Sequence, residues 1–391
     1  MKHPATLNDA CAIVGIGNTA YTRGTERSVL ELHLEASLKA LDDAGLKPTD
    51  VDGVIPSSSA ERVVEEFIRN LGLRELAISS TPYGGGSSFG MAMQEACMAI
   101  HAGVASCVLI PAGRNGYSSS QRISRQTDRP DPGMAHMSEF ELPLGNIGPA
   151  QWFAQAAQRH MYEYGTTSEQ LGKLAVTIRK HANLNPQAFM FDRSLSLEQH
   201  QASPIIVEPF HLFDCSLETD GAGAIVVVDA KRARDLSQVP VYISGIGVSF
   251  AYPGTSITQK DDMAVIDGIS VAGRRAYTMA GLTPDDIDCA EIHEGFSWFA
   301  VACLEALGFC KVGEGGPFVA DGNIDLGGLL PLNTHGGSLS EAHVSGANHV
   351  IEAVRQLRRT VEPERQVANC ERVLVANEGN FGNGAVMILR R

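Results

Sequence analysis

The chain has 391 residues, of which 44% are hydrophobic and 19% are charged, and its formal net charge at pH 7 is −14. This composition predicts a soluble globular protein with two domain-sized halves. The acidic balance and the lack of a basic stripe argue against nucleic acid, because phosphate contacts need clustered Lys and Arg. No run of about 18 apolar residues predicts a membrane span, and the N-terminus lacks a secretory signal. Eight cysteines without C-x-x-C spacing predict neither a zinc site nor a redox pair, and a cytoplasmic location is expected.

Strand-like and helical runs alternate along the chain, which predicts an α/β fold. Gly, Pro and Asn occupy most of the joints between these runs. In chain order we expect strand 11–16, helix 28–44, helix 61–71, helix 88–102, strand 106–111, strand 222–228, strand 241–248, helix 263–280, strand 289–293, helix 296–307, helix 343–358, strand 372–376 and strand 384–389.

One segment of the chain recurs. Residues 41–52 read LDDAGLKPTDVD, and residues 277–288 read YTMAGLTPDDID. In each copy an expected helix ends at a glycine, and a Pro-x-Asp step leads toward a buried strand. We therefore predict two related halves, the first formed by residues 1–113 with 210–235 and the second by residues 236–391.

Residues 114–209 depart from the repeating pattern. Large apolar side chains such as Trp152 and Met161 lie there among polar residues. We predict an insertion that caps a site and lines it with apolar groups, although it could also pack on the body without lining a site. His136 in this insertion is a further candidate for the site.

Two histidine motifs mark the expected site. His293 ends an apolar run and precedes Glu294, and His343 follows the Gly-rich stretch 333–342. Imidazole titrates near neutral pH, so each ring could accept or donate a proton. For Glu294 and Glu341 a structural role is preferred over orientation of the neighbouring histidines.

A glycine loop precedes the expected helix 88–102 and reads YGGGSS over residues 83–88. Glycines let a ligand carbonyl approach the backbone closely, and the first N–H groups of a helix can hold an oxyanion. Tyr83 and Glu378 are candidate acid or base groups, beside His293 and His343. The expected binding residues are Gly84, Gly85, Gly86, Ser87, His335, Gly336 and Gly384.

Taken in order, these blocks resemble the thiolase superfamily, in particular its sterol-carrier-protein thiolase branch and the thiolase-like steroid side-chain-CoA aldolases. The resemblance implies a five-layered αβαβα thiolase fold, a coenzyme A thioester as substrate, a homodimeric core and no bound cofactor or metal. It also implies a small OB-fold partner with a zinc ribbon, in a heterotetramer. The supporting blocks, besides the histidine motifs, are residues 44–46, 51–53, 102–109, 220–224 and 382–386.

The resemblance also assigns roles. It places His293 where such thiolases hold the thioester or enolate oxygen, and His343 where they activate a nucleophilic cysteine. The position of that cysteine falls on Gly86, and a second acid/base cysteine falls near Glu378. Without a thiolate at the first position the usual acyl-enzyme cannot form.

Retro-aldol chemistry needs a base for the β-hydroxyl and an oxyanion site, but no cysteine. We therefore predict a carbon–carbon lyase that cleaves a β-hydroxyacyl-CoA with a bulky apolar side chain into a carbonyl compound and a shorter acyl-CoA. Two alternatives stay open: a Claisen-type acyltransferase with another nucleophile close to Gly86, and a non-catalytic acyl-CoA-binding subunit. The branch aldolases carry tyrosines in the two histidine motifs, which leaves the identity of the base open.

Overall fold

The computed structural model describes residues 7–57, 64–118, 137–146, 148–251, 260–379 and 381–391, so the candidate His136 lies outside the described residues. The strands are β1 (Cys11–Asn18), β2 (Gly53–Val54), β3 (Ile78–Ser79), β4 (Cys107–Asn115), β5 (Ile205–Val207), β6 (Phe210–His211), β7 (Asp220–Asp229), β8 (Val241–Phe250), β9 (Cys289–His293), β10 (Arg372–Glu378) and β11 (Asn383–Arg390). The α-helices are α1 (Val29–Ala44), α2 (Val64–Leu71), α3 (Ser88–His101), α5 (Pro149–Tyr164), α6 (Ser168–Ala182), α7 (Leu197–Gln201), α8 (Ala230–Ala233), α9 (Asp267–Ala280), α10 (Ser297–Ala306), α11 (Gly315–Ala320) and α12 (Ala347–Arg358).

Within the described residues, nine strands form one mixed sheet in the order β3-β2-β4-β7-β1-β8-β11-β10-β9. Strands β1 and β8 join its two arms through the pairs Ala12–Tyr242 and Ile13–Val241. On one arm β4 pairs antiparallel with β7 and parallel with β2. On the other arm β10 pairs antiparallel with β11 and parallel with β9. The two arms therefore repeat one topology.

The internal repeat reappears in the local contacts. Helices α1 and α9 end at Gly45 and Gly281, with φ of 69° and 68°, values that favour glycine. Asp52 accepts a hydrogen bond from the first backbone N–H of β4 at 2.8 Å. Asp288 accepts one from the first backbone N–H of β10, also at 2.8 Å. The predicted repeat is confirmed by these matching contacts, whereas the proposed domain boundaries stay a prediction.

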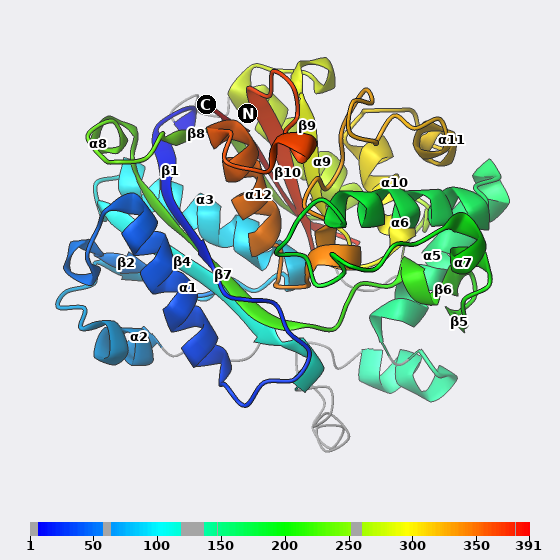
Figure 1. Ribbon diagram of the computed structural model, residues 1–391, viewed down its shortest axis with the longest axis horizontal. Helices are drawn as coiled ribbons and strands as arrows, with labels where there is room; N and C mark the ends of the chain where they lie inside the picture. Colours follow the sequence, from blue (N-terminus) through cyan, green and yellow to red (C-terminus); the bar gives the residue numbers. More distant parts are fainter. Residues whose placement is uncertain (1–6, 58–63, 119–136, 147, 252–259, 380) are drawn as a thin grey trace.

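Three buried apolar clusters lie between the layers of the molecule and hold them together. The first lies between α1 and the arm that contains β1, β4 and β7. The second holds α3 and α12 between the two arms. The third lies between the other arm and the helices α9 and α10. Helices thus cover both outer faces and fill the centre (Figure 1), and the predicted five-layered thiolase fold is confirmed.

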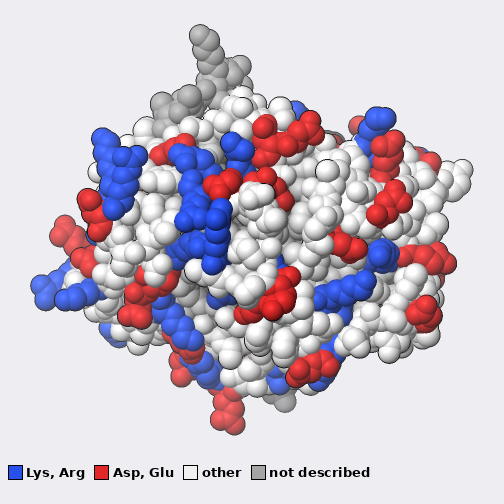
Figure 2. Space-filling view, turned by 45° about the horizontal axis from the view of Figure 1, so that its top comes forward, with Lys and Arg blue, Asp and Glu red and all other residues white. Residues whose placement is uncertain are grey.

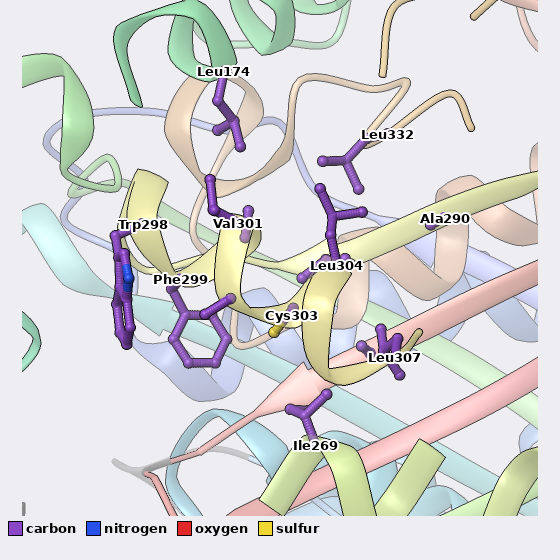
Figure 3. Packing of buried hydrophobic residues seen from close by; sticks show 14 of the residues in the cluster. Leu174, Ile269, Ala290, Trp298, Phe299, Val301, Cys303, Leu304, Leu307 and Leu332 are labelled. Carbon is purple, nitrogen blue, oxygen red and sulfur yellow. The ribbon is translucent and has the colours of Figure 1, made fainter. Parts of the chain in front are cut away.

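Helix α10 is apolar on all sides and lies inside the molecule. Its residues Trp298 and Phe299 are at most 1% exposed. Ile269 of α9 packs on one side of this helix, and Leu174 of α6 lies on another (Figure 3). Such a helix is stable only when it is buried all round. It directly follows β9, and so it anchors the strand that ends at His293.

The inserted residues between β4 and β7 form α5, α6, α7 and the β5–β6 hairpin, none of which the sequence predicts. They pack on the arm that contains β9. Phe153 of α5 lies 5.4 Å from Phe296 and 4.9 Å from Phe381, measured between ring centroids. The predicted capping role of residues 114–209 stays a prediction, since residues 119–136 are not described.

The predicted helix over 343–358 is wrong at its start, because α12 begins at Ala347. Ser345 and Gly346 have φ of 59° and 81°. These left-handed conformations cannot belong to a right-handed helix, so the helix does not extend back to His343. His343 lies in a loop, and its chemistry is not set by a helix N-terminus.

Candidate active site

Three loops meet where the two arms adjoin. The rings of His293, at the end of β9, and His343, before α12, lie 5.2 Å apart between centroids and are inclined by 52°. The glycine loop before α3 reaches the same place, since a Cβ atom on Gly86 would lie 2.8 Å from both Cε1 and Nδ1 of His293. That Cβ would also collide with the backbone oxygen of Glu378, at the end of β10. The fold therefore gathers four of the predicted residues from four distant segments.

No side chain fits at Gly86 unless the His293 ring or the β10 backbone moves. The two preceding glycines also serve backbone packing. A Cβ atom on Gly379 would collide with the carbonyl oxygen of Gly84, and Gly85 has φ of 61°. The backbone of Gly84 and Gly85 is thus packed closely against the backbone at Gly379, in the turn after β10.

The hydroxyl groups beside these glycines close the turn. Ser87 donates a hydrogen bond from Oγ to the carbonyl of Gly84 at 2.7 Å. Ser88 donates from Oγ to the carbonyl of Gly85, also at 2.7 Å. Both hydroxyls are therefore engaged in fixing the start of α3, and within the described residues neither makes a hydrogen bond to a histidine that could act as its base.

His293 is 5% exposed and uncharged. Burial lowers the pKa of His293 to about 4, a change that the nearby Glu378 carbonyl partly opposes and the Arg114 charge reinforces. Neither ring nitrogen makes a hydrogen bond to a described residue. A neutral imidazole carries one N–H and one lone pair, so His293 can donate to a ligand oxygen.

His343 is also held in the neutral form. Nη1 of Arg114 lies 3.2 Å from its Nδ1, and the Ser216 hydroxyl lies 3.3 Å from the same nitrogen. Its backbone N–H donates to Thr219 at 3.0 Å, which fixes the loop. Burial, the Arg114 charge and the neighbouring His293 lower the pKa of His343 well below its ordinary value. The ring is therefore unprotonated at neutral pH and able to accept a proton.

Glu378 is a buried acid at the end of β10. Its side chain is 5% exposed, and its Oε1 has no hydrogen-bond partner in the described part of the chain. Burial raises the pKa of Glu378 well above its ordinary value. Burial therefore favours the protonated form of the carboxyl group, the form that can deliver a proton to a reacting carbon.

His335 lies in a buried network behind the two site histidines. Its Nδ1 is 2.9 Å from Glu291 Oε2, and its Nε2 is 3.6 Å from Glu341 Oε2. Burial alone would lower the pKa of His335, but the two glutamates raise it to about 9. The ring is a buried cation. Gly336, with φ of 108°, packs on Ala182 of α6, so neither residue reaches the place where the loops meet.

Tyr83 and Gly384 are two further predicted residues. Tyr83 is 56% exposed and lines a surface hollow with Met91 and Phe250. Gly384 lies within β11, where a Cβ atom would come within 2.7 Å of the Gly268 backbone in α9. Gly384 is the register partner of Glu378 across β10 and β11, and the roles of Tyr83 and Gly384 stay predictions.

Neither Cys303 nor Cys215 is suited to act as a nucleophile. Cys303 on α10 is fully buried, and burial followed by the charge of Glu378 raises its pKa well above the ordinary value. Burial raises the pKa of Cys215 to about 12. The thiolate form that attacks an acyl group is disfavoured at both positions.

The wider surface and interior add two observations. Basic and acidic side chains are interspersed over most of the described part of one face, with one contiguous group of basic side chains left of its centre (Figure 2). In the described ranges, no cluster of three or more His, Cys, Asp or Glu side chains is arranged to hold a metal ion, and no helix is long and apolar enough to cross a membrane.

Residues 251–391 match the family model described as thiolase C-terminal domain-like. A steroid side-chain-cleaving aldolase from Thermomonospora curvata is 41% identical over 363 residues, which cover 91% of this chain and 92% of that relative. The chain belongs to the thiolase superfamily. A 17-hydroxy-3-oxo-4-pregnene-20-carboxyl-CoA lyase from Mycobacterium tuberculosis is 41% identical over 94% of this chain and 96% of its own length.

Among solved structures, this member of the thiolase superfamily is similar to the Ltp2-ChsH2(DUF35) aldolase, with a TM-score of 0.92 and 39% identity over 98% of both chains. The predictions of the superfamily and of a carbon–carbon lyase are confirmed by these relatives. Two residues of this thiolase-superfamily site were missed by the sequence analysis. Arg114 lies at the end of the buried strand β4, a position that marks a site edge, and His349 lies on α12 without a motif of its own.

Proposed function

We propose that this chain catalyses retro-aldol cleavage of a β-hydroxyacyl-CoA that carries a bulky apolar side chain. The proposal rests mainly on one observation: the space beside Cα of Gly86, where a side chain would lie, is already occupied by other atoms. The space that a thiolase nucleophile would need holds the ring of His293 and the backbone of Glu378. The neutral ring of His343 lies against that of His293, and Glu378, whose carboxyl pKa burial raises, is the residue whose backbone touches position 86. The arrangement supports proton transfer and enolate stabilisation, and it leaves no place for acyl transfer to the enzyme.

The reaction starts with removal of the β-hydroxyl proton. His343 is unprotonated and accepts this proton, and the electrons of the broken Cα–Cβ bond move into the thioester as an enolate. The β-carbon leaves as a carbonyl group. Because Arg114 lies against the ring, the imidazolium is electrostatically unfavourable and passes its proton on.

The enolate then needs an oxyanion partner and a proton. His293 donates its single N–H to the enolate oxygen. Glu378 gives its proton to the α-carbon, which produces the shorter acyl-CoA, and regains a proton from His343. The hydroxyl proton thus ends on the α-carbon, and no cofactor or net proton is consumed.

The substrate is proposed from the relatives. Their names describe steroid side-chain cleavage and a 17-hydroxy steroid carboxyl-CoA. We infer a steroid-like tertiary alcohol as the β-hydroxyacyl group. The similar solved structure is that of an aldolase whose name pairs Ltp2 with ChsH2 (DUF35). We infer a small partner protein of this kind, with an OB fold and a zinc ribbon, bound to a homodimer of this chain.

The two alternatives are less well supported. A Claisen-type acyltransferase would need a thiolate, and burial raises the pKa of both Cys303 and Cys215. A non-catalytic subunit would bind acyl-CoA without turnover, and it would not need a buried acid and a neutral base around one point.

The test uses the chain co-purified with the small partner protein and a β-hydroxyacyl-CoA that bears a tertiary alcohol. Products are followed by mass spectrometry for wild type, His343→Ala and the exposed control His101→Ala. A ketone and a shorter acyl-CoA, formed by wild type and by the control and lost in His343→Ala, would establish the lyase. Cleavage of acetoacetyl-CoA by free CoA would establish the acyltransferase, and binding without turnover would establish the non-catalytic subunit.

A further inference from the structure

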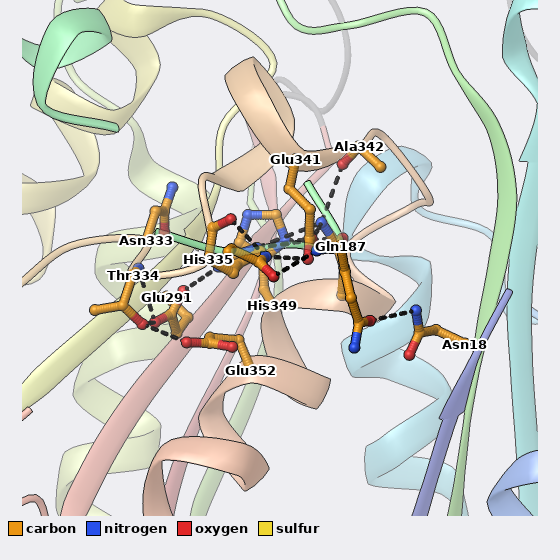
Figure 4. Close-up of polar contacts among 12 residues, drawn as sticks. Asn18, Gln187, Glu291, Asn333, Thr334, His335, Glu341, Ala342, His349 and Glu352 are labelled. Carbon is orange, nitrogen blue, oxygen red and sulfur yellow. Dashed lines mark hydrogen bonds and ion pairs between the residues drawn. The ribbon is translucent and has the colours of Figure 1, made fainter. Parts of the chain in front are cut away.

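A second histidine lies directly behind the site. The ring of His349, on α12, makes an edge-on contact with His293 at 5.5 Å between centroids and 77° between planes. On its other side it makes a similar contact with the buried cation His335, at 4.7 Å and 86°. Figure 4 shows His349 and His335 within the polar network, with Glu291 and Glu341 close by. Any rotation of the His349 ring would therefore disturb its contact with His293.

The protonation of His349 follows from its neighbour Asn348. The Asn348 amide nitrogen donates to Glu341 Oε2 at 2.9 Å and to the carbonyl of Ala342 at 3.0 Å. These two acceptors fix the orientation of the amide, so its oxygen faces His349 Nδ1 at 3.2 Å. An amide oxygen only accepts, and Nδ1 of His349 therefore carries a proton.

The other nitrogen of His349 faces a carboxyl group. Its Nε2 is 3.1 Å from Oε2 of Glu294, whose Oε1 accepts the backbone N–H of Leu339 at 3.1 Å. With Nδ1 already protonated, one proton lies between Nε2 and Oε2. Burial raises the pKa of Glu294 to about 8 and lowers that of His349 well below its ordinary value. The proton therefore belongs to Glu294, and the pair is uncharged at neutral pH.

Several titratable groups face this pair. His293 and His343 face it from the site, and Cys303 of α10 faces Glu294. From below, the His335 cation disfavours a second positive charge on His349, while the neighbouring Glu291 disfavours ionisation of Glu294. The same His335 cation favours ionisation of Glu294, but burial, the largest influence on this carboxyl group, outweighs it and keeps the pKa raised.

We propose that Glu294 and His349 are positioning residues for His293: the proton that they share holds the His349 ring in the orientation on which the His293 ring packs. The inference rests on the proposed lyase function, in which His293 binds the enolate oxygen. When Glu294 ionises, its Oε2 faces an unprotonated Nε2. The His349 ring must then change tautomer, which breaks the bond to Asn348, or rotate away.

The kinetic test compares two substitutions of Glu294 in the complex with the partner protein. Glu294→Gln keeps an N–H donor toward His349 Nε2 and an oxygen toward Leu339, but it cannot ionise. We expect its kcat at pH 7 to stay close to that of wild type and its pH profile to lack a decline near pH 8. Glu294→Leu removes the donor. We expect kcat to fall about 10- to 100-fold with little change in KM, as for other groups that orient a catalytic imidazole.

The direct test is nitrogen NMR of histidine-labelled protein, with His349 assigned through His349→Gln. We expect a protonated Nδ1 and a hydrogen-bonded, unprotonated Nε2 below pH 8, a change above it in wild type and no change in Glu294→Gln. A doubly protonated His349 at pH 7, or a Glu294→Gln variant that is as inactive as Glu294→Leu, would overturn the proposal. Absence of turnover by wild type would overturn the lyase function alone, since the NMR titration tests the pair without substrate.

Discussion

The guanidinium of Arg114 lies against the ring of His343, with Nη1 3.2 Å from Nδ1 and 3.4 Å from Nε2. The two residues come from the end of β4 and from the loop before α12. An arginine stays charged throughout the usable pH range, so it opposes protonation of His343 at every pH. Burial and the charge of Arg114 together keep His343, the base of the proposed reaction, in its neutral form.

Replacing Arg114 by Met should raise the pKa of His343, because one cause of its lowering is removed. The acid side of the kcat/KM profile then moves to higher pH, by about one unit. The measurement is kcat/KM between pH 4.5 and 8 for wild type and variant. An unchanged acid side would mean that burial alone keeps His343 neutral.

Substituting Gly86 by Cys should not create a thiolase. The new Cβ would lie 2.8 Å from the His293 ring and would collide with the β10 backbone. Overpacking of this kind costs about 1–3 kcal/mol of folding stability, and the displaced His293 should abolish cleavage. Gly148→Ala is the matched control, since among the described residues its Cβ meets only Gln151, at 3.7 Å. Thiolytic cleavage of acetoacetyl-CoA by Gly86→Cys would show that the site tolerates a nucleophile there.

Glu378→Gln tests the acid. Glutamine has the shape of the protonated carboxyl group but no proton to give to the enolate. We expect kcat to fall about 100-fold, in the range of general-acid contributions. Incorporation of solvent deuterium into the α-carbon of the shorter acyl-CoA should slow in parallel. A variant with normal turnover would assign protonation of the carbon to another group.

Because His33 is buried, we expect the free energy of unfolding to decrease at acidic pH. It is fully buried on α1, packs on Phe67, and burial lowers its pKa to about 4, which the Gly113 carbonyl only partly opposes. In the unfolded chain the group titrates near pH 6.5. Because the folded pKa is the lower one, stability is present above about pH 6.5 and is lost as pH falls toward about 4, by about 1.4 kcal/mol per pH unit.

The substitution His33→Phe removes the group that binds a proton on unfolding and keeps an aromatic ring at this position. Urea unfolding at pH 7 and pH 5 should show a smaller loss of stability for the variant than for wild type. The exposed His101→Gln should leave the pH dependence unchanged. Equal losses in all three proteins would show that His33 already binds its proton in the folded state.

Much of the fold could be predicted because its signals are local. Strand β9 covers the predicted residues 289–293, and α1 and α9 end at the predicted glycines. A run of apolar residues bounded by a turn needs no knowledge of its neighbours. The start of α12 was missed because Ser345 adopts a left-handed conformation that is uncommon for a residue other than glycine and that no local pattern signals.

By itself, the sequence determined the thiolase fold, the absence of a nucleophile at Gly86 and the two histidines of the site. The charge on each histidine was decided only by the tertiary structure. His293 and His335 are both buried, yet the pKa of His293 falls to about 4 and that of His335 rises to about 9. Burial lowers both, but His335 lies between Glu341, further along its own loop, and Glu291, which β9 brings from another segment of the chain. Desolvation and the charges of distant residues set these values, and neither is visible until the chain is folded.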